Sequence, residues 1–407
     1  MGLIVHKYGG TSVGSMDRIR TVAKRVKRTK DEGHDVVVVV SAMSGETDRL
    51  IKMAHEMSPN PNEREYDMLI STGEQVSMAL LSIALNDLGC PSESFTGYQV
   101  GILTDSSHSK ARILDISTDT IHAKLKEGKV VIIAGFQGVD IHHAITTLGR
   151  GGSDTSAVAV AAALKADLCE IYTDVDGVYT ADPRIVKKPK KLTKISHDEM
   201  LEMASLGAKV LQSRSVEFAK KYNVPLSVRT SFSDEPGTYV VEETEDMENA
   251  IVTGIAILRD QARVNVLDLP NVPGIAAKIF KAIAKETINV DMIVLTENNY
   301  GGTDISFTVN KHDLAKSRKI VEKISADVHT KGITVEEGVG KVSVVGVGMR
   351  TQPGVAADVF DSLGSNGVNI EMISTSEIKI SCLIKEKDLE HAMRVLHDRF
   401  HPEAQKD

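Results

Sequence analysis

The chain has 407 residues, a formal net charge of −8, 42 % hydrophobic residues and 26 % charged residues. This length corresponds to about two to four domains of ~100–200 residues, and the near-average composition disfavours disordered and fibrous proteins. The negative charge disfavours a nucleic-acid partner. The apolar runs at 36–40 and 157–164 are shorter than the ~18 residues that a membrane span needs.

The N-terminus and the cysteines bear on where the protein works. The chain leads directly into an apolar, β-branched segment, without the cleavage region of a signal peptide. Cys90, Cys169 and Cys382 lie far apart and form no CxxC pair, which argues against a disulfide scaffold and a zinc ribbon. We therefore expect a cytoplasmic protein without a membrane partner.

The first half alternates short β-branched segments with longer helical stretches. Strands are expected at 3–8, 35–41, 130–135 and 170–174, and helices at 16–32, 63–88, 153–166 and 208–222. The valines 36–40 lack polar alternation, as expected of a parallel strand that is covered on both faces. The alternation predicts an α/β sandwich on a mostly parallel sheet. Ligand chemistry should then gather at the carboxyl ends of its strands.

The second half begins after an expected solvated linker and contains an internal repeat. Turn residues precede an acidic run at 242–248, which has little apolar periodicity. Beyond it, the segment 273–293 aligns with 353–373 at a constant offset of 80 residues. Each copy fits a ferredoxin-like βαββαβ unit. The predicted organisation is a first domain at 1–235, a linker at 236–250 and two further domains at 251–338 and 339–407.

The first motif that could carry chemistry runs from Lys7 to Gly14, at the end of the strand 3–8. Glycines there allow a tight turn that brings backbone amides close to an anion. The following helix, with Ser15 as its expected cap, points its positive end the same way. Lys7 can reach the same phosphates as a point charge. The alternative is an ordinary turn, and the Walker A pattern is absent.

The second motif, 146–155, places three glycines and Arg150 before an expected helix. The arginine is suited to bidentate binding of a carboxylate. Ser153 and Asp154 could be ordinary capping residues, but capping leaves Arg150 among glycines unexplained.

The third motif, 172–184, supplies hydroxyls, carboxylates, a tyrosine and an arginine in one loop, as a nucleotide site would require. An EF-hand calcium loop is disfavoured because the distal glutamate is missing. The default interpretation of Glu74 is a solvated charge on a helix. Lys209 lies at the start of the helix expected from 208, where a positive charge opposes the helix dipole unless a phosphate binds beside it. No GxGxxG or HExxH pattern is present, so neither a dinucleotide site nor a protein-held metal is expected.

Four segments together resemble the aspartokinases, which have the amino-acid-kinase fold: Lys7-Tyr-Gly-Gly-Thr-Ser, Ser41-Ala-Met, Leu148-Gly-Arg-Gly-Gly-Ser-Asp, and the loop from Tyr172 to Arg184. The repeat resembles the tandem ACT domains that follow that kinase. The resemblance covers nearly the whole chain in the family's order. It implies an αβα sandwich with a mostly parallel sheet, followed by two ferredoxin-like βαββαβ ACT domains, without the homoserine dehydrogenase domain of some relatives. It also implies transfer of the γ-phosphate of Mg-ATP to the β-carboxylate of L-aspartate, the first step toward lysine, methionine and threonine.

The resemblance implies roles for individual residues. Lys7, Asp154 and Lys209 would be catalytic. ATP would be bound by Lys7, Tyr8, Gly9, Gly10, Thr173, Asp174, Tyr179, Arg184, Lys209 and Val210. Aspartate would be held by Ser41, Thr47, Glu74, Arg150, Gly151, Gly152, Ser153 and Asp154, with Glu74 on the ammonium group and Arg150 on a carboxylate. Mg²⁺ would arrive with the nucleotide.

The ACT pair would bind effectors, with lysine as the expected inhibitor, alone or jointly with threonine. Effector contacts would come from Asn271, Pro273, Gly274, Ile275, Ala276, Ala277, Asn289, Val290, Asp291, Asn369, Ile370, Thr375 and Ser381. Pro-Gly turns and asparagines at strand starts also serve packing alone. ACT pairing implies a homodimer or higher oligomer. Met247 is a candidate start of a separately made regulatory subunit.

Two other functions stay open at this stage. Another amino-acid kinase, such as a glutamate 5-kinase or a uridylate kinase, would lack the tandem repeat and the contexts of Glu74 and Arg150. An inactive amino-acid sensor would bind nucleotide without turnover, which the intact Lys7, Asp154 and Lys209 disfavour.

Overall fold

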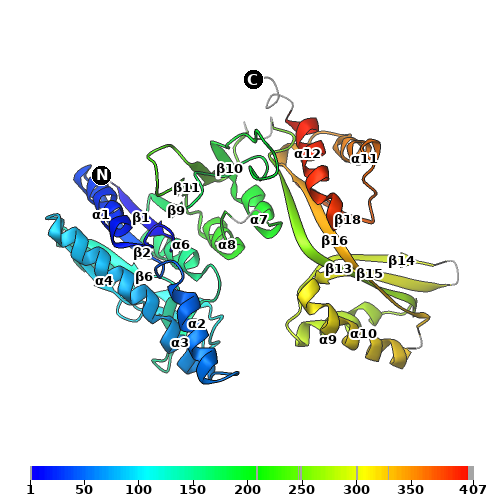
Figure 1. Ribbon diagram of the computed structural model, residues 1–407, viewed down its shortest axis with the longest axis horizontal. Helices are drawn as coiled ribbons and strands as arrows, with labels where there is room; N and C mark the ends of the chain where they lie inside the picture. Colours follow the sequence, from blue (N-terminus) through cyan, green and yellow to red (C-terminus); the bar gives the residue numbers. More distant parts are fainter. Residues whose placement is uncertain are drawn as a thin grey trace. The chain divides into compact units, whose positions relative to one another are not determined.

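The computed structural model describes residues 2–207, 210–245, 247, 250–298, 301–328 and 330–401. The chain divides into two compact units (Figure 1). The first comprises Met1–Tyr179, Lys191–Ser205 and Lys209–Met247. The second comprises Thr180–Lys190, Leu206–Ala208 and Glu248–Asp407.

An eight-stranded sheet forms the centre of the first unit, in the order β10-β12-β11-β9-β1-β2-β6-β3. Its strands are β1 (Leu3–Tyr8), β2 (Asp35–Val40), β3 (Ser92–Phe95), β6 (Val130–Ala134), β9 (Leu168–Thr173), β10 (Lys194–Ser196), β11 (Leu226–Thr230) and β12 (Thr238–Val241). Only the β11–β12 pair is antiparallel in this sheet, as far as the described residues go. A smaller sheet of order β5-β4-β7-β8 contains β4 (Ile102–Thr104), β5 (Ile113–Ile116), β7 (Gln137–Val139) and β8 (Ile145–Thr147).

Helices cover both faces of the large sheet, which confirms the expected αβα sandwich (Figure 1). The helices of this unit are α1 (Met16–Asp31), α2 (Glu46–Met57), α3 (Glu63–Ile70), α4 (Thr72–Asp87), α5 (Asp119–Lys126), α6 (Gly152–Leu164), α7 (His197–Ser205) and α8 (Ser213–Tyr222). α1 packs with α4, and α6 packs with α8.

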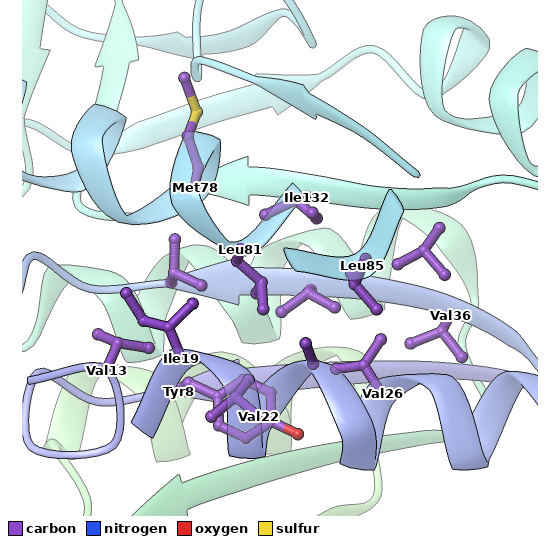
Figure 2. Packing of buried hydrophobic residues seen from close by; sticks show 14 of the residues in the cluster. Tyr8, Val13, Ile19, Val22, Val26, Val36, Met78, Leu81, Leu85 and Ile132 are labelled. Atoms are coloured by element: carbon purple, nitrogen blue, oxygen red, sulfur yellow. The ribbon is translucent and has the colours of Figure 1, made fainter. Parts of the chain in front are cut away.

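The core on the α1 side of the sheet shows why these segments fold as they do (Figure 2). Ile19, Val22 and Val26 recur at helical spacing along α1 and are buried against Tyr8 and the even-numbered valines of β2. All five valines at 36–40 are fully buried, so β2 is covered on both faces as the sequence predicts. The Ser15 hydroxyl accepts the Arg18 amide at 3.3 Å, which confirms the expected cap of α1.

Most expected elements agree with the structure to within about two residues at each end, and three differ more. The single helix expected at 63–88 is divided into α3 and α4 at Ser71. There the hydroxyls of Ser71 and Thr72 donate to carbonyl oxygens three residues back. The helix expected at 208–222 begins at Ser213, after the extended Gln212. Residues 238–241, expected within the linker, form β12 because Thr238 is buried and β12 pairs with both β10 and β11.

The stretch 63–87 is long and apolar enough to cross a membrane by length and composition alone. Half of its apolar window is nevertheless buried within the protein, where α4 packs on α1 and β6. A helix that covers a sheet shows the same composition, so this stretch is weak evidence for a membrane span.

The second unit contains the repeat, and its two copies share one sheet of order β14-β15-β13-β16-β18-β17. Its elements are β13 (Gly254–Pro270), α9 (Ile275–Lys285), β14 (Val290–Glu297), β15 (Gly302–Asn310), α10 (Leu314–Val328), β16 (Gly332–Val345), α11 (Val355–Ser365), β17 (Met372–Ser376), β18 (Lys379–Lys385) and α12 (Leu389–Phe400), with short 3₁₀ turns at Lys311–Asp313, Val347–Arg350 and Glu386–Asp388. α9 and α11 lie 80 residues apart, which confirms the register of the repeat.

Two long strands join the copies. The start of β13, 254–258, pairs with 341–345 of β16, while 263–267 pairs with 332–336. Each copy therefore has four strands and two helices. The second copy takes one of its four strands from residues 254–258, which precede the first copy in the sequence. Because one sheet runs through both copies, the domain boundaries at 250 and 338 stay predictions.

Candidate active site

A cavity of about 810 Å³ lies where β1, β2 and β6 end and α6 begins. The carboxyl ends of these parallel strands meet at one edge of the sheet, as expected for a ligand site in this architecture. Ten of the residues predicted for aspartate or ATP line this cavity: Lys7, Gly10, Ser41, Thr47, Glu74, Arg150, Gly151, Gly152, Ser153 and Asp154. All eight predicted aspartate residues are thus brought together from three separate parts of the sequence, 41–47, 74 and 150–154.

A buried ion pair forms one wall of the cavity. Lys7 Nζ lies 2.6 Å from Asp154 Oδ1, and both residues are largely buried. Asp154 is in the first turn of α6, where the alternative role was helix capping, but that helix begins after Gly151 without a side-chain cap. Asp154 therefore holds the Lys7 ammonium group, which makes Lys7 a fixed positive charge at the cavity.

The glycines after β1 leave no room for side chains. A Cβ atom at Gly10 would lie 2.9 Å from the Ala42 carbonyl oxygen, and one at Gly9 would lie 3.3 Å from Lys7 Nζ. The Gly9 amide donates to the Tyr172 carbonyl oxygen at 3.1 Å, which joins this turn to the end of β9. The turn therefore brings backbone close to the Lys7 charge, as an anion site requires.

Glu74 is a buried acid with one oxygen available. It is 3 % exposed, and its Oε1 accepts the Ala42 amide at 3.1 Å. Its Oε2 has no hydrogen-bond partner in the part of the chain that the structure describes. Burial raises the pKa of Glu74 to about 7, against the opposing effect of the Ala42 amide. Glu74 is therefore not a solvated helix charge, and a bound cation would supply its missing partner.

Arg150 lies on a short loop that enters the cavity between two glycines of positive φ. Gly149 has φ +75° and Gly151 has φ +70°, which favours glycine over other residues. A Cβ atom at Gly151 would lie 2.0 Å from Gln212 Cγ. Arg150 itself is exposed, so its guanidinium group is open to a carboxylate.

The residues predicted to bind the rest of ATP lie outside this cavity. Thr173 ends β9, the neighbour of β1, and Asp174 follows it. The Tyr179 hydroxyl donates to Asp176 at 3.0 Å. Arg184 is 82 % exposed, pairs with Asp182 and belongs to the second unit.

Three further predicted ATP residues need separate comment. The Tyr8 ring is fully buried and stacks on Tyr172 with a centroid distance of 4.7 Å, so only its backbone can reach a ligand. Lys209 lies outside the described residues. Val210 is described and half-buried, in a turn before α8.

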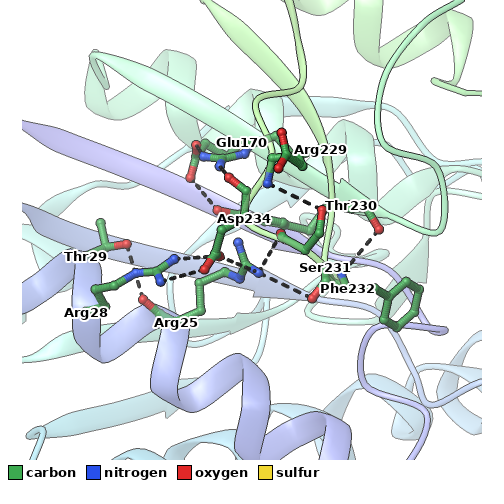
Figure 3. A network of polar contacts seen from close by, with 12 residues as sticks. Arg25, Arg28, Thr29, Glu170, Arg229, Thr230, Ser231, Phe232 and Asp234 are labelled. Carbon is green, nitrogen blue, oxygen red and sulfur yellow. Dashed lines mark hydrogen bonds and ion pairs between the residues drawn. The ribbon is translucent and has the colours of Figure 1, made fainter. Parts of the chain in front are cut away.

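A second polar cluster lies on the α1 side of the sheet, away from the cavity (Figure 3). Arg28 donates to both oxygens of Asp234, at 3.0 and 2.8 Å. Arg229 pairs with Glu170 at 2.8 Å. Burial alone would raise the pKa of Glu170, but the hydrogen bonds from His6 and Arg229 lower it to about 2. The cluster ties the segment after β11 to α1.

In the second unit, the predicted effector residues are mostly exposed. The turn 271–274, Asn289 and Asn369 are exposed, and Asn271 bonds Glu297 at 2.9 Å. Asp291 pairs with Lys341, which is buried. Ser381 differs from the others, because it is 1 % exposed and bonds Ser343 at 2.7 Å inside the sheet.

Several cavity residues carry no signal that sequence reasoning used. Tyr66, Ser109, Phe136 and Gln212 also line the cavity. They come from loops and helix ends whose approach depends on tertiary folding, and none belongs to a recognisable motif.

Comparisons with known proteins place these features in a family context. A profile of the amino acid kinase family matches residues 2–230, and a profile of the ACT domain matches residues 267–324 and 342–400. The aspartate kinase of Pseudomonas putida is 54 % identical over 405 residues, which cover 99 % of this chain and 98 % of that protein.

Two solved structures of E. coli aspartokinase III also resemble the chain over 98 % of its length and 99 % of theirs. The complex with aspartate and ADP has 26 % identity and a TM-score of 0.83. The complex with lysine and aspartate has 27 % identity and a TM-score of 0.77.

Proposed function

Because this chain belongs to the amino acid kinase family, and within it to the aspartokinases, we propose that it transfers the γ-phosphoryl group of ATP to the β-carboxylate of L-aspartate. The products are 4-phospho-L-aspartate and ADP. The observation that carries the proposal is the cavity in which the Lys7–Asp154 pair, the exposed Arg150 and the unpartnered Glu74 oxygen meet. This set fits a ligand with one ammonium and two carboxylate groups.

The chemistry needs charge and positioning rather than a general base. A carboxylate is already ionised at neutral pH and can attack phosphorus directly, so no proton has to be removed. The difficulty is to bring two anions together, which fixed positive charges overcome. Glu74 accepts the substrate ammonium group, Arg150 binds the α-carboxylate, and Lys7 neutralises charge on the transferring phosphoryl group. Asp154 keeps the Lys7 ammonium group in place.

The nucleotide would lie beside the aspartate, along the end of β9. Gly9 and Gly10 would lie against the phosphate oxygens, with Tyr8 contributing backbone. The Gly10 amide would be the donor, because the Gly9 amide already donates to the Tyr172 carbonyl oxygen. Thr173, Asp174, Tyr179, Arg184, Lys209 and Val210 would bind the rest of ATP. Mg²⁺, which would neutralise phosphate charge, would come with the nucleotide. In the described ranges no group of three or more His, Cys, Asp or Glu is arranged to hold a metal ion.

The two ACT copies would regulate the kinase activity. The E. coli relative was solved in complex with lysine and aspartate, and the ACT-domain profile matches two segments of this chain. Lysine, alone or jointly with threonine, would inhibit by binding at 271–277 and 289–291 and at the corresponding segment of the second copy, with Asn369, Ile370 and Thr375. The protein would act in the cytoplasm as an ACT-paired dimer or larger oligomer, at the first step toward lysine, methionine and threonine. A regulatory subunit starting at Met247 stays a prediction.

The test is to trap the acyl phosphate with hydroxylamine. Purified protein is incubated with Mg-ATP and L-aspartate, with and without lysine and threonine. Aspartate-dependent hydroxamate supports the proposal, and its suppression by lysine supports the regulatory half. Phosphorylation of L-glutamate or UMP, tested in the same way, would instead favour a sister kinase. No product with any acceptor would favour an amino-acid sensor.

A further inference from the structure

Asp67, on α3, is a buried carboxylate that no step of the proposed reaction uses. It is fully buried, although a lone buried carboxylate is costly. Its oxygens accept the Thr147 amide at 3.0 Å, the Thr147 hydroxyl at 2.6 Å and the Ser109 amide at 3.0 Å. His108 Nδ1 lies 2.9 Å away and donates as well, because a carboxylate can only accept. With the Ser109 hydroxyl, which donates at 3.5 Å, five donors from two segments converge on one side chain.

Both segments border the aspartate cavity. Thr147 ends β8 and begins the loop that carries Arg150, and Ser109 also lines the cavity. The two segments are joined to each other, since the Ala111 amide donates to the Thr147 carbonyl oxygen at 2.9 Å. A Cβ atom at Gly149 would lie 3.0 Å from the Ser109 carbonyl oxygen, so the loop passes closely over this second segment. A shift of Thr147 would therefore move Arg150.

The helix that carries Asp67 leads into the helix that carries Glu74. The Ser71 amide still donates to the Asp67 carbonyl oxygen at 3.1 Å, so the helical hydrogen-bond pattern continues from the end of α3 toward the start of α4. Residues seven apart lie on the same side of a helix, about two turns from each other. Asp67 thus ties the Arg150 loop to the element that carries Glu74.

We propose that Asp67 is a positioning residue that sets the place of Arg150 relative to Glu74 and so determines how tightly L-aspartate binds. This inference rests on the proposed function, in which Arg150 binds the α-carboxylate of aspartate and Glu74 binds its ammonium group. Asp67 acts through Thr147 and contacts neither L-aspartate nor ATP.

The test is Asp67→Asn. The amide keeps the shape of the side chain, but in either orientation its NH₂ group faces a backbone N–H donor of Thr147 or Ser109. We expect the KM for L-aspartate to rise about tenfold or more, while the KM for ATP changes by less than about twofold. The matched control is Asp140→Asn. Asp140 is also buried and holds the His142 and Ala144 amides at 2.9 Å, but it does not line the cavity.

A purely structural role would predict a lower melting temperature in both variants and unchanged KM values, and that result would overturn the inference. If Asp67→Asn does not fold, Thr147→Val and Thr147→Ser replace it. Thr147 is fully buried, and only serine retains the hydroxyl that Asp67 accepts. The inference requires the valine variant to bind aspartate more weakly than the serine variant, and equal KM values would contradict it. If the unaltered protein forms no aspartyl hydroxamate, the proposed function fails instead.

Discussion

Lys7 Nζ lies 2.6 Å from Asp154 Oδ1 at the cavity wall, and 147 residues of sequence separate the two. The ammonium group leaves β1 while the carboxylate belongs to the first turn of α6. Two elements of the sandwich must therefore be packed before the charge is in place. Because the pair is largely buried, water screens the Lys7 charge only weakly.

Replacing Lys7 by Met should lower kcat by about 10²–10³-fold and change the KM for aspartate much less, because the lost charge acts on the transferring phosphoryl group. Asp154→Asn should have a smaller effect of the same kind, since Lys7 remains but is held less firmly. Steady-state kinetics with both substrates measures the two effects. Lys27→Met is the control, because Lys27 pairs with Asp31 on the surface of α1. Near-normal turnover of Lys7→Met would remove Lys7 from the mechanism.

Glu74 makes aspartate binding depend on pH. Its ordinary pKa is 4.5, and burial raises it to about 7 in the folded protein. A substrate ammonium group binds only the ionised form well, so the KM for aspartate should fall as pH rises from 6 to about 8. Glu74→Gln should raise the KM and abolish this dependence. Glu65→Gln, at an exposed position of α3, should leave the pH profile unchanged.

The same pKa has a consequence for stability without substrate. Between pH 4.5 and about 7 the folded protein holds a proton that the unfolded chain has released. The free energy of unfolding should therefore decrease as pH rises through this window, by roughly 3 kcal/mol at most from this group. Denaturant unfolding of the unaltered protein and of Glu74→Gln, compared at pH 5 and pH 8, isolates the contribution. A pH effect of equal size in both proteins would contradict it.

The sequence predicts the sandwich because its evidence is local. The buried valines of β2 and the helical spacing of α1 each appear within a few residues, and the structure confirms both. The burial of Glu74 could not be derived this way, because it depends on Ala42 and on the loops that close the cavity. The start of α8 was missed for a related reason, since a run of helix-forming residues does not show where packing allows a helix to begin.

Activity should be more sensitive to substitution of Gly151 than to substitution of Gly128, a glycine with a similar φ angle. Gly151 and Gly128 have φ values of +70° and +76°, so alanine at either should cost about 1 kcal/mol of stability. A Cβ atom at Gly128 meets nothing within 4 Å, whereas at Gly151 it would displace Gln212. Only Gly151→Ala should therefore lower kcat/KM for aspartate, by about 10²-fold, because Arg150 is its neighbour. Equal kinetics of the two variants would show that this loop tolerates displacement.

Equivalent acidic residues of the two repeat copies form ion pairs across the copies. Asp291, at the start of β14 in the first copy, pairs with Lys341 on β16. Its equivalent 80 residues later, Glu371, pairs with Arg263 of β13 at 3.3 Å. Each acid thus reaches a base on the opposite copy, and each lies beside a segment predicted to bind effectors.

Asp291→Asn should therefore affect both stability and control. Lys341 is buried, so loss of its partner should lower the free energy of unfolding by roughly 2 kcal/mol. Because Asp291 is itself one of the predicted effector contacts, the lysine concentration for half-inhibition should rise while the uninhibited kcat stays unchanged. Asp327→Asn is the control, since its pair with Lys278 at 3.7 Å is exposed. Destabilisation with unaltered lysine inhibition would limit the Asp291–Lys341 pair to a structural role.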